Sequence, residues 1–453
     1  MSGDKAMKKK LVEEFQIKGY WKIPCKPEKV AGTLFYTQDE IRLELLGSFG
    51  GDLIFDFSLS KYDTLFGFSD HGEQFSLYDV QLKHSPSNFP GFMTQTYSVK
   101  EFIVGGHFEQ KNDITFHSMM LYPTYLAEWI GRLHYTTIYK EENQRTYINA
   151  VEWNKAPHIS TYIAAKEFQL EEIHANDVTY KTQGLEWANR TALKIIPNEP
   201  KGLNWYNETR NTLHLFLTTM INKPVSEMSV VFTGDVDERL AEEGLTIRKT
   251  YKYFYRSDAA KVEETFRADQ ALIKFSDIET NIGEMISKWF EFRDNHKIVS
   301  ELYSEQFYKP SYVNSSFLNA LQTLELYHNK ITGYRTTKLE KRLKDLFDSL
   351  HFDSSQFLIG SDAEKELLIA ALVDTRNYLT HFDLGEKQHI LEDDEKFTVG
   401  MLLKAIIGFI ILRDLGISED ILVKRFAEEW DIAYNIHKGK MYFRVQANEL
   451  VLK

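Results

Sequence analysis

The sequence predicts an α+β multidomain protein, with a β-rich N-terminal region followed by an all-α helical bundle. Short aromatic and aliphatic runs dominate as far as about residue 256, and apolar residues then recur at every third or fourth position. No repeat with a period of roughly 20–50 residues is evident, which disfavours a solenoid or a propeller. We therefore expect a β-rich domain over residues 1–170, its continuation or a second β subdomain over 171–256, and a helical region over 257–453.

The first strands are predicted near the N-terminus, beginning with Phe15–Ile23. Gly32–Tyr36 and Ile41–Leu46 flank the polar segment Thr37–Glu40, an arrangement typical of a β-hairpin. In the second of these runs, apolar residues alternate with charged ones, as expected for a strand with one buried face. The same pattern predicts later strands at Phe75–Val80, Phe102–Phe108 and Tyr147–Trp153.

A second group of strands is expected after a soft boundary near Glu167–Thr179. Short runs rich in β-branched and aliphatic residues predict strands at Ala192–Ile196, Leu213–Thr219 and Met228–Thr233. The first two runs are separated by the turn-forming segment Pro197–Gly202.

Helices are predicted from Ser257 onward, where Ser257-Asp258 is a suitable cap for a helix that begins at Ala259. Ser361–Glu364 has the pattern of a capping box, and Ser418 opens a later helix. Two apolar stripes have the spacing of helices that bury one face. They consist of Phe317, Leu318, Leu321, Leu324 and Leu326, and of Leu367, Leu368, Ala371, Leu372, Thr375 and Leu379.

The most apolar window, Phe397–Leu412, is about 16 residues long and contains Lys404, so it falls short of the ~20 residues that span a bilayer. We expect a buried helix in a bundle instead. The N-terminal segment Met1–Glu14 has a basic run but no apolar stretch after it, which is not the pattern of a secretory signal. No membrane association is therefore expected.

Composition excludes several classes of protein. Lys and Arg number 54 and Asp and Glu number 66, and this net charge of -12 disfavours a protein that coats nucleic acid or anionic membranes. Aromatic residues make up 14% of the chain, which disfavours a largely disordered protein. The one cysteine, Cys25, permits no intrachain disulfide and no cysteine-cluster zinc site, so we expect a reducing, cytoplasmic location. Common nucleotide-loop, zinc-protease and serine-hydrolase motifs are absent from the sequence, and no cofactor or metal is expected.

One segment, Asp374–His381, carries residue types suited to catalysis. Asn377 and His381 are four residues apart and share a helix face, whereas Arg376 lies about 140° from His381 around the axis. Histidine can act as a general base or acid, and arginine binds phosphate oxygens through two N–H groups. These groups suit metal-independent cleavage of RNA by the ribose 2′-OH, which gives a 2′,3′-cyclic phosphate and a 5′-OH.

The motif is Arg-x(4)-His, and it is the one Arg-x(4–6)-His pattern in the sequence. Such a short pattern also arises by chance, and the alternative interpretation is a solvated helix end that carries Arg and His as C-terminal caps.

The segment resembles the hallmark of the HEPN superfamily, R-x(4–6)-H on a helix of a small bundle, often with a polar residue after the arginine. Arg376, Asn377 and His381 match this pattern, and Phe317–Glu325 is similar to the first helix of such domains. The resemblance implies a HEPN domain over about residues 305–453. Some HEPN toxins carry tyrosine two residues after the histidine, but this sequence has Asp383 there, so regulation by modification of that tyrosine is not implied.

Over nearly its full length the chain is similar to the ApeA family, which combines a β-rich N-terminal domain with a C-terminal HEPN ribonuclease. The similarity includes Gly19–Pro24, Val30–Leu34 and Leu65–Ser69. It implies a homodimer, or a higher oligomer, in which two copies of Arg376 and His381 form one cleft. It also implies an RNA substrate, often tRNA, and growth arrest of a phage-infected bacterium after a phage-derived trigger.

Two other interpretations remain open at this stage. The helical region is a non-catalytic HEPN-type dimerisation module fused to a β domain that senses a ligand or protein, in which case Arg376 and His381 make structural hydrogen bonds. Alternatively, the β-rich region binds carbohydrate or peptide and the helices are accessory.

Overall fold

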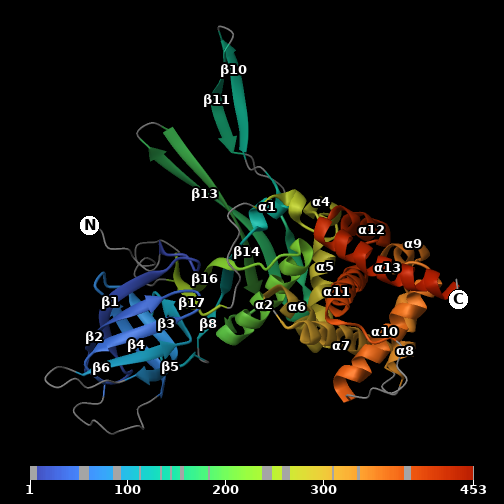
Figure 1. The fold of residues 1–453 in the computed structure, drawn as a ribbon. Coiled ribbons are helices and arrows are strands. Elements are labelled where there is room, and N and C mark those ends of the chain that lie inside the picture. Colours follow the sequence, from blue (N-terminus) through green and yellow to red (C-terminus); the bar gives the residue numbers. More distant parts are fainter. Residues whose placement is uncertain are drawn as a thin grey trace. The chain divides into compact units, whose positions relative to one another are not determined.

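The computed structural model describes residues 8–49, 61–84, 93–111, 114–132, 135–142, 145–153, 158–181, 184–236, 247–257, 266–308, 311–333, 337–381 and 389–451. The chain divides into two compact units. The first contains Met1–His214 and Val225–Thr265, and the second contains Leu215–Pro224 and Phe266–Lys453. Strands dominate the first unit and helices the second, as the sequence predicts (Figure 1).

A six-stranded antiparallel barrel begins the first unit. Its strands follow the order β5-β4-β1-β2-β3-β6, and β6 closes the barrel by pairing with β5. The hairpin predicted at Thr37–Glu40 is confirmed, because the Thr37 N–H donates to the Glu40 carbonyl at 2.8 Å. The strands are β1 (Phe15–Lys22), β2 (Val30–Tyr36), β3 (Ile41–Leu46), β4 (Lys61–Ser69), β5 (Gln74–His84) and β6 (Thr94–Val99).

Alternation of apolar and polar residues along these strands fills the barrel with large side chains. Trp21 is fully buried and is paired in register with Gly67 on the neighbouring strand. A Cβ atom at Gly67 would lie 2.3 Å from the Trp21 ring, so this position admits no side chain without displacing the indole. The ring of Phe75 packs at 5.8 Å from that of Trp21.

The sheet continues beyond the barrel, because β5 also pairs with β7. From β7 the order is β17, β16, β9, β14, β13 and β12, so thirteen described strands form one sheet. The boundary expected between residues 170 and 171 falls within β13, where the strand runs without a break. These strands are β7 (Glu101–Val104), β9 (Ser118–Pro123), β12 (Ser160–Ile163), β13 (Phe168–Lys181), β14 (Gly184–Pro197), β16 (Glu227–Val236) and β17 (Arg248–Tyr255).

Two further strand pairs are separate from this sheet. They are β10 (Tyr135–Glu142) with β11 (Arg145–Trp153), and β8 (Thr115–Phe116) with β15 (Lys201–Gly202). Short helices also interrupt the first unit, namely α1 (Leu126–Ile130) and the 3₁₀ helix η4 (Ala164–Lys166).

The strand predicted at Leu213–Thr219 is wrong, because these residues lie in helix α2 (Leu203–Ile221). Threonines in this segment and directly before it are accommodated in the helix by local hydrogen bonds. The Thr212 and Thr219 hydroxyls each donate to the carbonyl four residues earlier, at 2.9 and 2.8 Å. The helical spacing of the buried residues Leu213, Phe216, Leu217 and Met220 outweighs the local β propensity.

A buried ionic cluster joins the middle of α2 to β16 and β17. Glu227 accepts a hydrogen bond from the Tyr255 hydroxyl at 2.6 Å and lies 3.0 Å from His214 Nδ1. The Arg210 guanidinium lies over the Tyr255 ring, 3.9 Å from its centroid. Burial alone would raise the pKa of Glu227, but the His214 imidazole and the Arg210 guanidinium lower it to about 2.

The second unit is built mainly of helices. The helix predicted to begin at Ala259 lies outside the described residues. The described elements start with η5 (Ala268–Gln270), α4 (Phe275–Ile278), α5 (Ile282–Asn295) and α6 (Lys297–Tyr308). They continue with α7 (Val313–Thr332), α8 (Leu339–Asp348), α9 (Phe352–Leu358), α10 (Asp362–His381), α11 (Asp393–Asp414), α12 (Glu419–Glu428) and α13 (Trp430–Val451).

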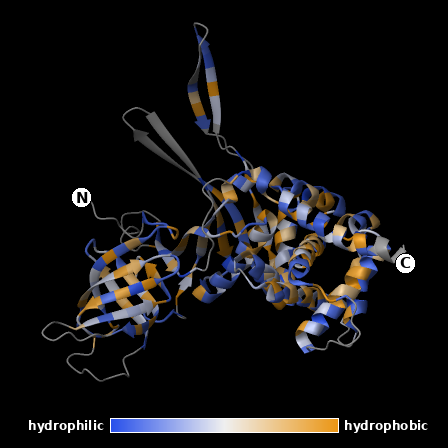
Figure 2. Ribbon diagram, in the orientation of Figure 1, coloured by the Kyte–Doolittle hydropathy of each residue, from blue (hydrophilic) through white to orange (hydrophobic). Residues whose placement is uncertain are grey.

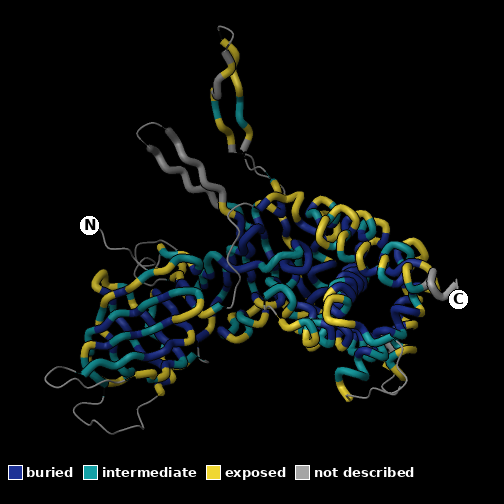
Figure 3. Tube along the Cα trace, viewed as in Figure 1, coloured by how far each residue is buried: buried dark blue, intermediate teal, exposed yellow. Residues whose placement is uncertain are grey.

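Helix α11 forms the core of this bundle. It contains the apolar window Phe397–Leu412, in which most residues are buried, and it packs against α6, α7, α9, α12 and α13. Figures 2 and 3 show the same helix as a largely hydrophobic and buried segment. The expectation of a buried helix is therefore confirmed, and no helix of the described chain has the length and apolarity needed to cross a bilayer.

Candidate functional site

The helix that carries the Arg-x(4)-His motif begins with the predicted capping box. The Ser361 N–H and hydroxyl both donate to Glu364 Oε2, at 2.5 and 2.8 Å, and the Glu364 N–H donates to Ser361 Oγ at 3.3 Å. From α13, Arg444 Nε donates to the other carboxylate oxygen of Glu364 at 3.0 Å. The start of α10 is thus closed by its own side chains and tied to a second helix.

The apolar stripe then fixes the rotation of α10 in the bundle. Leu368, Leu372 and Thr375 are fully buried, whereas Leu379 is half-buried. Because one face is held by packing, the residues of the last turns project from a rigid element rather than from a loop. Arg376 and Asn377 are half-buried on this helix, and His381, its last residue, is exposed.

A buried hydrogen bond secures the last turns of α10 to the chain that leads into α11. The backbone N–H of Leu391 donates to the Thr375 hydroxyl at 2.9 Å. Both residues are buried, and α11 begins two residues later with its own Glu392–Glu395 capping box. Thr375, which directly precedes the motif, is therefore held both by the packing of α10 and by the hydrogen bond from Leu391.

Arg376 turns toward the face that carries the histidine. Its Nη1 donates to Asn377 Oδ1 at 3.3 Å, and Asn377 shares a face with His381. The guanidinium thereby bridges part of the 140° or so that separates Arg376 from His381 around the helix axis. The Arg376 carbonyl accepts a hydrogen bond from the Thr380 hydroxyl at 2.8 Å. The structure thus places the three predicted residues on consecutive turns of one helix end.

An acidic hollow lies next to the motif. It has a volume of about 600 Å³ and is lined by Tyr378, by Ile390 and Leu391, and by Glu392, Asp393, Asp394 and Lys396 at the start of α11. Arg376, Asn377 and His381 are not among its described lining residues. Three of its described lining side chains are carboxylates, which disfavour an anionic ligand in this hollow.

The described residues include no cluster of three or more His, Cys, Asp or Glu side chains arranged to hold a metal ion. The chemistry offered by α10 is that of an imidazole, a guanidinium and an amide.

Comparison with protein families separates the chain into two matched parts. Residues 16–289 match the ApeA N-terminal domain 1, and residues 291–421 match the Apea-like HEPN domain. The chain belongs to the ApeA family. The resemblance noted in the sequence is therefore confirmed, and so is the order of a β-rich region followed by a helical HEPN region. No curated protein and no solved structure matches the chain.

Membership in the ApeA family indicates the general class of function of the chain. HEPN domains are usually ribonucleases that dimerise and bind RNA, and the ApeA domains point to anti-phage defence by abortive infection. The HEPN domain therefore supports a nuclease or another RNA-related role. Arg376, Asn377 and His381 all lie within the matched HEPN residues 291–421.

Sequence reasoning missed the long-range hydrogen bonds that hold the motif helix, from Leu391 to Thr375 and from Arg444 to Glu364. Thr375 is the one polar residue in a stripe of leucine and alanine, and this polarity is the local signal of its role. Its partner Leu391 is sixteen residues away and has no distinguishing feature in the sequence. The same holds for Arg444, whose pairing with Glu364 depends on how two helices pack.

Proposed function

We propose that this ApeA-family chain is a metal-independent endoribonuclease whose HEPN domain cleaves tRNA or another cellular RNA during abortive infection. The observation that carries the proposal is the hydrogen bond from Arg376 to Asn377 on α10, beside His381 at the end of the helix. A cation and a titratable imidazole are thus brought toward one face of a helix end that is fixed by packing.

Each residue has a distinct role in the proposed reaction. Arg376 stabilises the charge that develops on the phosphorus as the ribose 2′-OH attacks. His381 acts as general base or general acid, which typically contributes ~10²–10⁴ in rate. Asn377 orients the guanidinium through its side-chain oxygen. The products are a 2′,3′-cyclic phosphate and a 5′-OH end.

The reaction needs a base for the 2′-OH and an acid for the leaving 5′-oxygen, whereas one α10 offers one motif histidine. We therefore propose that two copies of α10 meet in a homodimer, so that two imidazoles and two guanidinium groups share one cleft. In this proposal, the β-rich region restrains the nuclease and responds to the phage-derived trigger.

The exposure of the motif favours catalysis over the alternative of a non-catalytic dimerisation module. In that alternative, Arg376 and His381 would be buried and paired within one subunit. Among the described residues, His381 is exposed, and the hydrogen bond that the Arg376 side chain forms is with its neighbour Asn377. Both groups are therefore available to a ligand or to a second copy.

Cleavage of purified RNA in excess chelator tests the proposal. The wild type should cut tRNA with EDTA present and leave 2′,3′-cyclic phosphate ends, whereas Arg376→Ala and His381→Ala should lose ~10²-fold or more of the rate. Thr380→Val, whose side chain is exposed on the same helix, is the matched control and should retain cleavage. Cleavage that depends on added Mg²⁺, or full activity of both alanine variants, would overturn this mechanism.

A further inference from the structure

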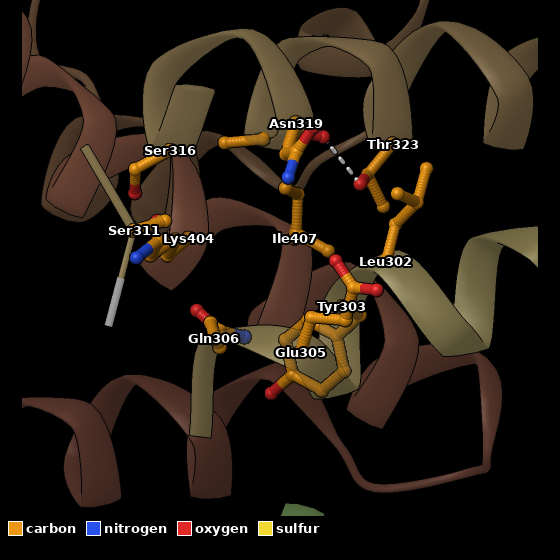
Figure 4. Close-up of a pocket in the computed structure, with 11 residues that line it drawn as sticks. Leu302, Tyr303, Glu305, Gln306, Ser311, Ser316, Asn319, Thr323, Lys404 and Ile407 are labelled. Carbon is orange, nitrogen blue, oxygen red and sulfur yellow. Dashed lines mark hydrogen bonds between the residues drawn. The ribbon is translucent and has the colours of Figure 1, made fainter. Parts of the chain in front are cut away.

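A cavity lies among α6, α7 and α11, apart from the motif residues (Figure 4). Its volume is about 50 Å³. Water needs roughly 10–15 Å³ of such space, so the cavity has room for a few waters or for one small polyatomic group. Its polar lining residues include Glu305, Gln306, Ser311, Ser316, Asn319, Thr323 and Lys404.

Lys404 is the charged residue that interrupts the apolar sequence of α11 between Lys396 and Arg413. It is half-buried, and burial lowers the pKa of its ammonium group. Within the described part of the chain, the Lys404 side chain forms neither an ion pair nor a hydrogen bond. Because an unpaired and partly desolvated charge is unfavourable, this position is expected to gain from a bound anion.

The neighbouring polar side chains are also without protein partners in the described residues. This holds for Gln306 on α6, for Ser311 before α7, and for Ser316 and Asn319 on α7. By contrast, the Thr323 hydroxyl at the same cavity is satisfied, since it donates to the Asn319 carbonyl at 2.6 Å. Figure 4 shows the Ser316 hydroxyl and the Gln306 amide on either side of the Lys404 ammonium. Donor groups from three segments thus converge on one space.

We propose that this cavity binds a phosphate group, with Lys404 as its counter-charge and Gln306, Ser316 and Asn319 as hydrogen-bond donors. Donors that approach from several directions match a tetrahedral anion with several oxygens better than a flat carboxylate. The small volume suits the phosphate itself rather than a base or a sugar.

The carboxylate of Glu305 stands on the exposed side of the same cavity. It repels an anion in the cavity, but it can accept a hydrogen bond from a hydroxyl on the organic group that is esterified to the phosphate. A phosphate monoester with such a hydroxyl, for example a nucleoside monophosphate, should therefore bind more tightly than inorganic phosphate. The ligand would clamp α6, α7 and α11 together, whether or not α10 cleaves RNA.

Calorimetric titration of the full-length chain with inorganic phosphate and with adenosine monophosphate tests this proposal. All proteins in this titration carry Arg376→Ala, which removes phosphate binding at the motif. The result is therefore independent of whether the chain is a nuclease. In that background, Lys404→Met should weaken binding of both ligands by about ten-fold or more, and Asn319→Ala by a few-fold. Lys438→Met, at an exposed lysine of α13, is the matched control and should bind as its parent.

The Lys404→Met variant should remain folded, because it replaces a poorly solvated ammonium by an apolar group of similar length. Its helical circular dichroism and its thermal midpoint check this, and Asn319→Ala serves as the second variant if it does not. Equal binding by Lys404→Met and its parent would overturn the proposal. So would the lack of any binding heat with either ligand up to about 10 mM, where even weak affinity is measurable.

Discussion

The hydroxyl of Thr375 accepts a buried hydrogen bond of 2.9 Å from the backbone N–H of Leu391. This contact ties the helix that carries Arg376 to the chain that enters α11, one residue before the arginine. The motif therefore projects from a position that is fixed independently of any ligand.

Thr375→Val removes the acceptor and leaves the Leu391 N–H buried without a partner. Such a group typically costs ~1–3 kcal/mol of stability, so the variant should have a lower urea midpoint. The backbone amide proton of Leu391 should also exchange with deuterium faster in this variant than in the wild type. Thr380→Val, on the exposed side of the same helix, should change the unfolding free energy by less than about 0.5 kcal/mol. An unchanged midpoint for Thr375→Val would show that this hydrogen bond does not hold the end of α10.

The buried cluster of Glu227, His214 and Arg210 predicts an acid-sensitive first unit. The pKa of Glu227 is lowered to about 2 from an ordinary 4.5, so its ionised form stabilises the fold above about pH 4.5. That stability is lost as the pH falls from about 4.5 toward 2. Glu227→Gln removes one of the two buried carboxylates that act on Arg210, the other being Glu101, and breaking a buried ion pair typically costs ~3–5 kcal/mol at neutral pH.

Urea unfolding at several pH values, followed by near-ultraviolet circular dichroism, measures this dependence. The difference in stability between about pH 7 and pH 3 should be smaller in Glu227→Gln than in the wild type. Glu199→Gln, at an exposed carboxylate of the same unit, should leave the pH profile unchanged. Identical profiles for the wild type and Glu227→Gln would rule out this cluster as the source of acid sensitivity.

Gly67→Ala places a methyl group against the ring of Trp21. The added Cβ would lie 2.3 Å from the indole, and overpacking of a filled core typically costs ~1–3 kcal/mol. The variant should have a lower unfolding free energy and an altered tryptophan fluorescence spectrum. At Gly202 an added Cβ meets only ordinary contacts, at 3.6 Å, so Gly202→Ala is the matched control. If both variants were equally stable, the close approach of Gly67 to Trp21 would not limit the barrel.

Local patterns predicted the parts of the fold that depend on local interactions. The capping box at Ser361–Glu364, the hairpin at Thr37–Glu40 and the buried helix around Lys404 each depend on residues close in sequence. Closure of the barrel through β5 and β6 was not predicted, because register between strands is set by packing across the whole sheet. The error at Leu213–Thr219 has the same origin, since burial of α2 outweighed the β propensity of its threonines.

In the candidate site, too, features that depend on residues close in sequence were predicted, and contacts between distant residues were not. The spacing of Arg376, Asn377 and His381 was visible in the sequence, and so was the apolar stripe that orients them. The tether at Leu391 and the tie from Arg444 were not visible, because each joins residues that only the folded bundle brings together.

Sequencing of RNA ends from infected cells tests the central claim most directly. Cells that express the wild type should accumulate tRNA fragments with 2′,3′-cyclic phosphate and 5′-OH ends, and cells that express His381→Ala at the same level should not. The same new ends in both strains, or none in either strain during growth arrest, would contradict the proposal that Arg376 and His381 form a ribonuclease site.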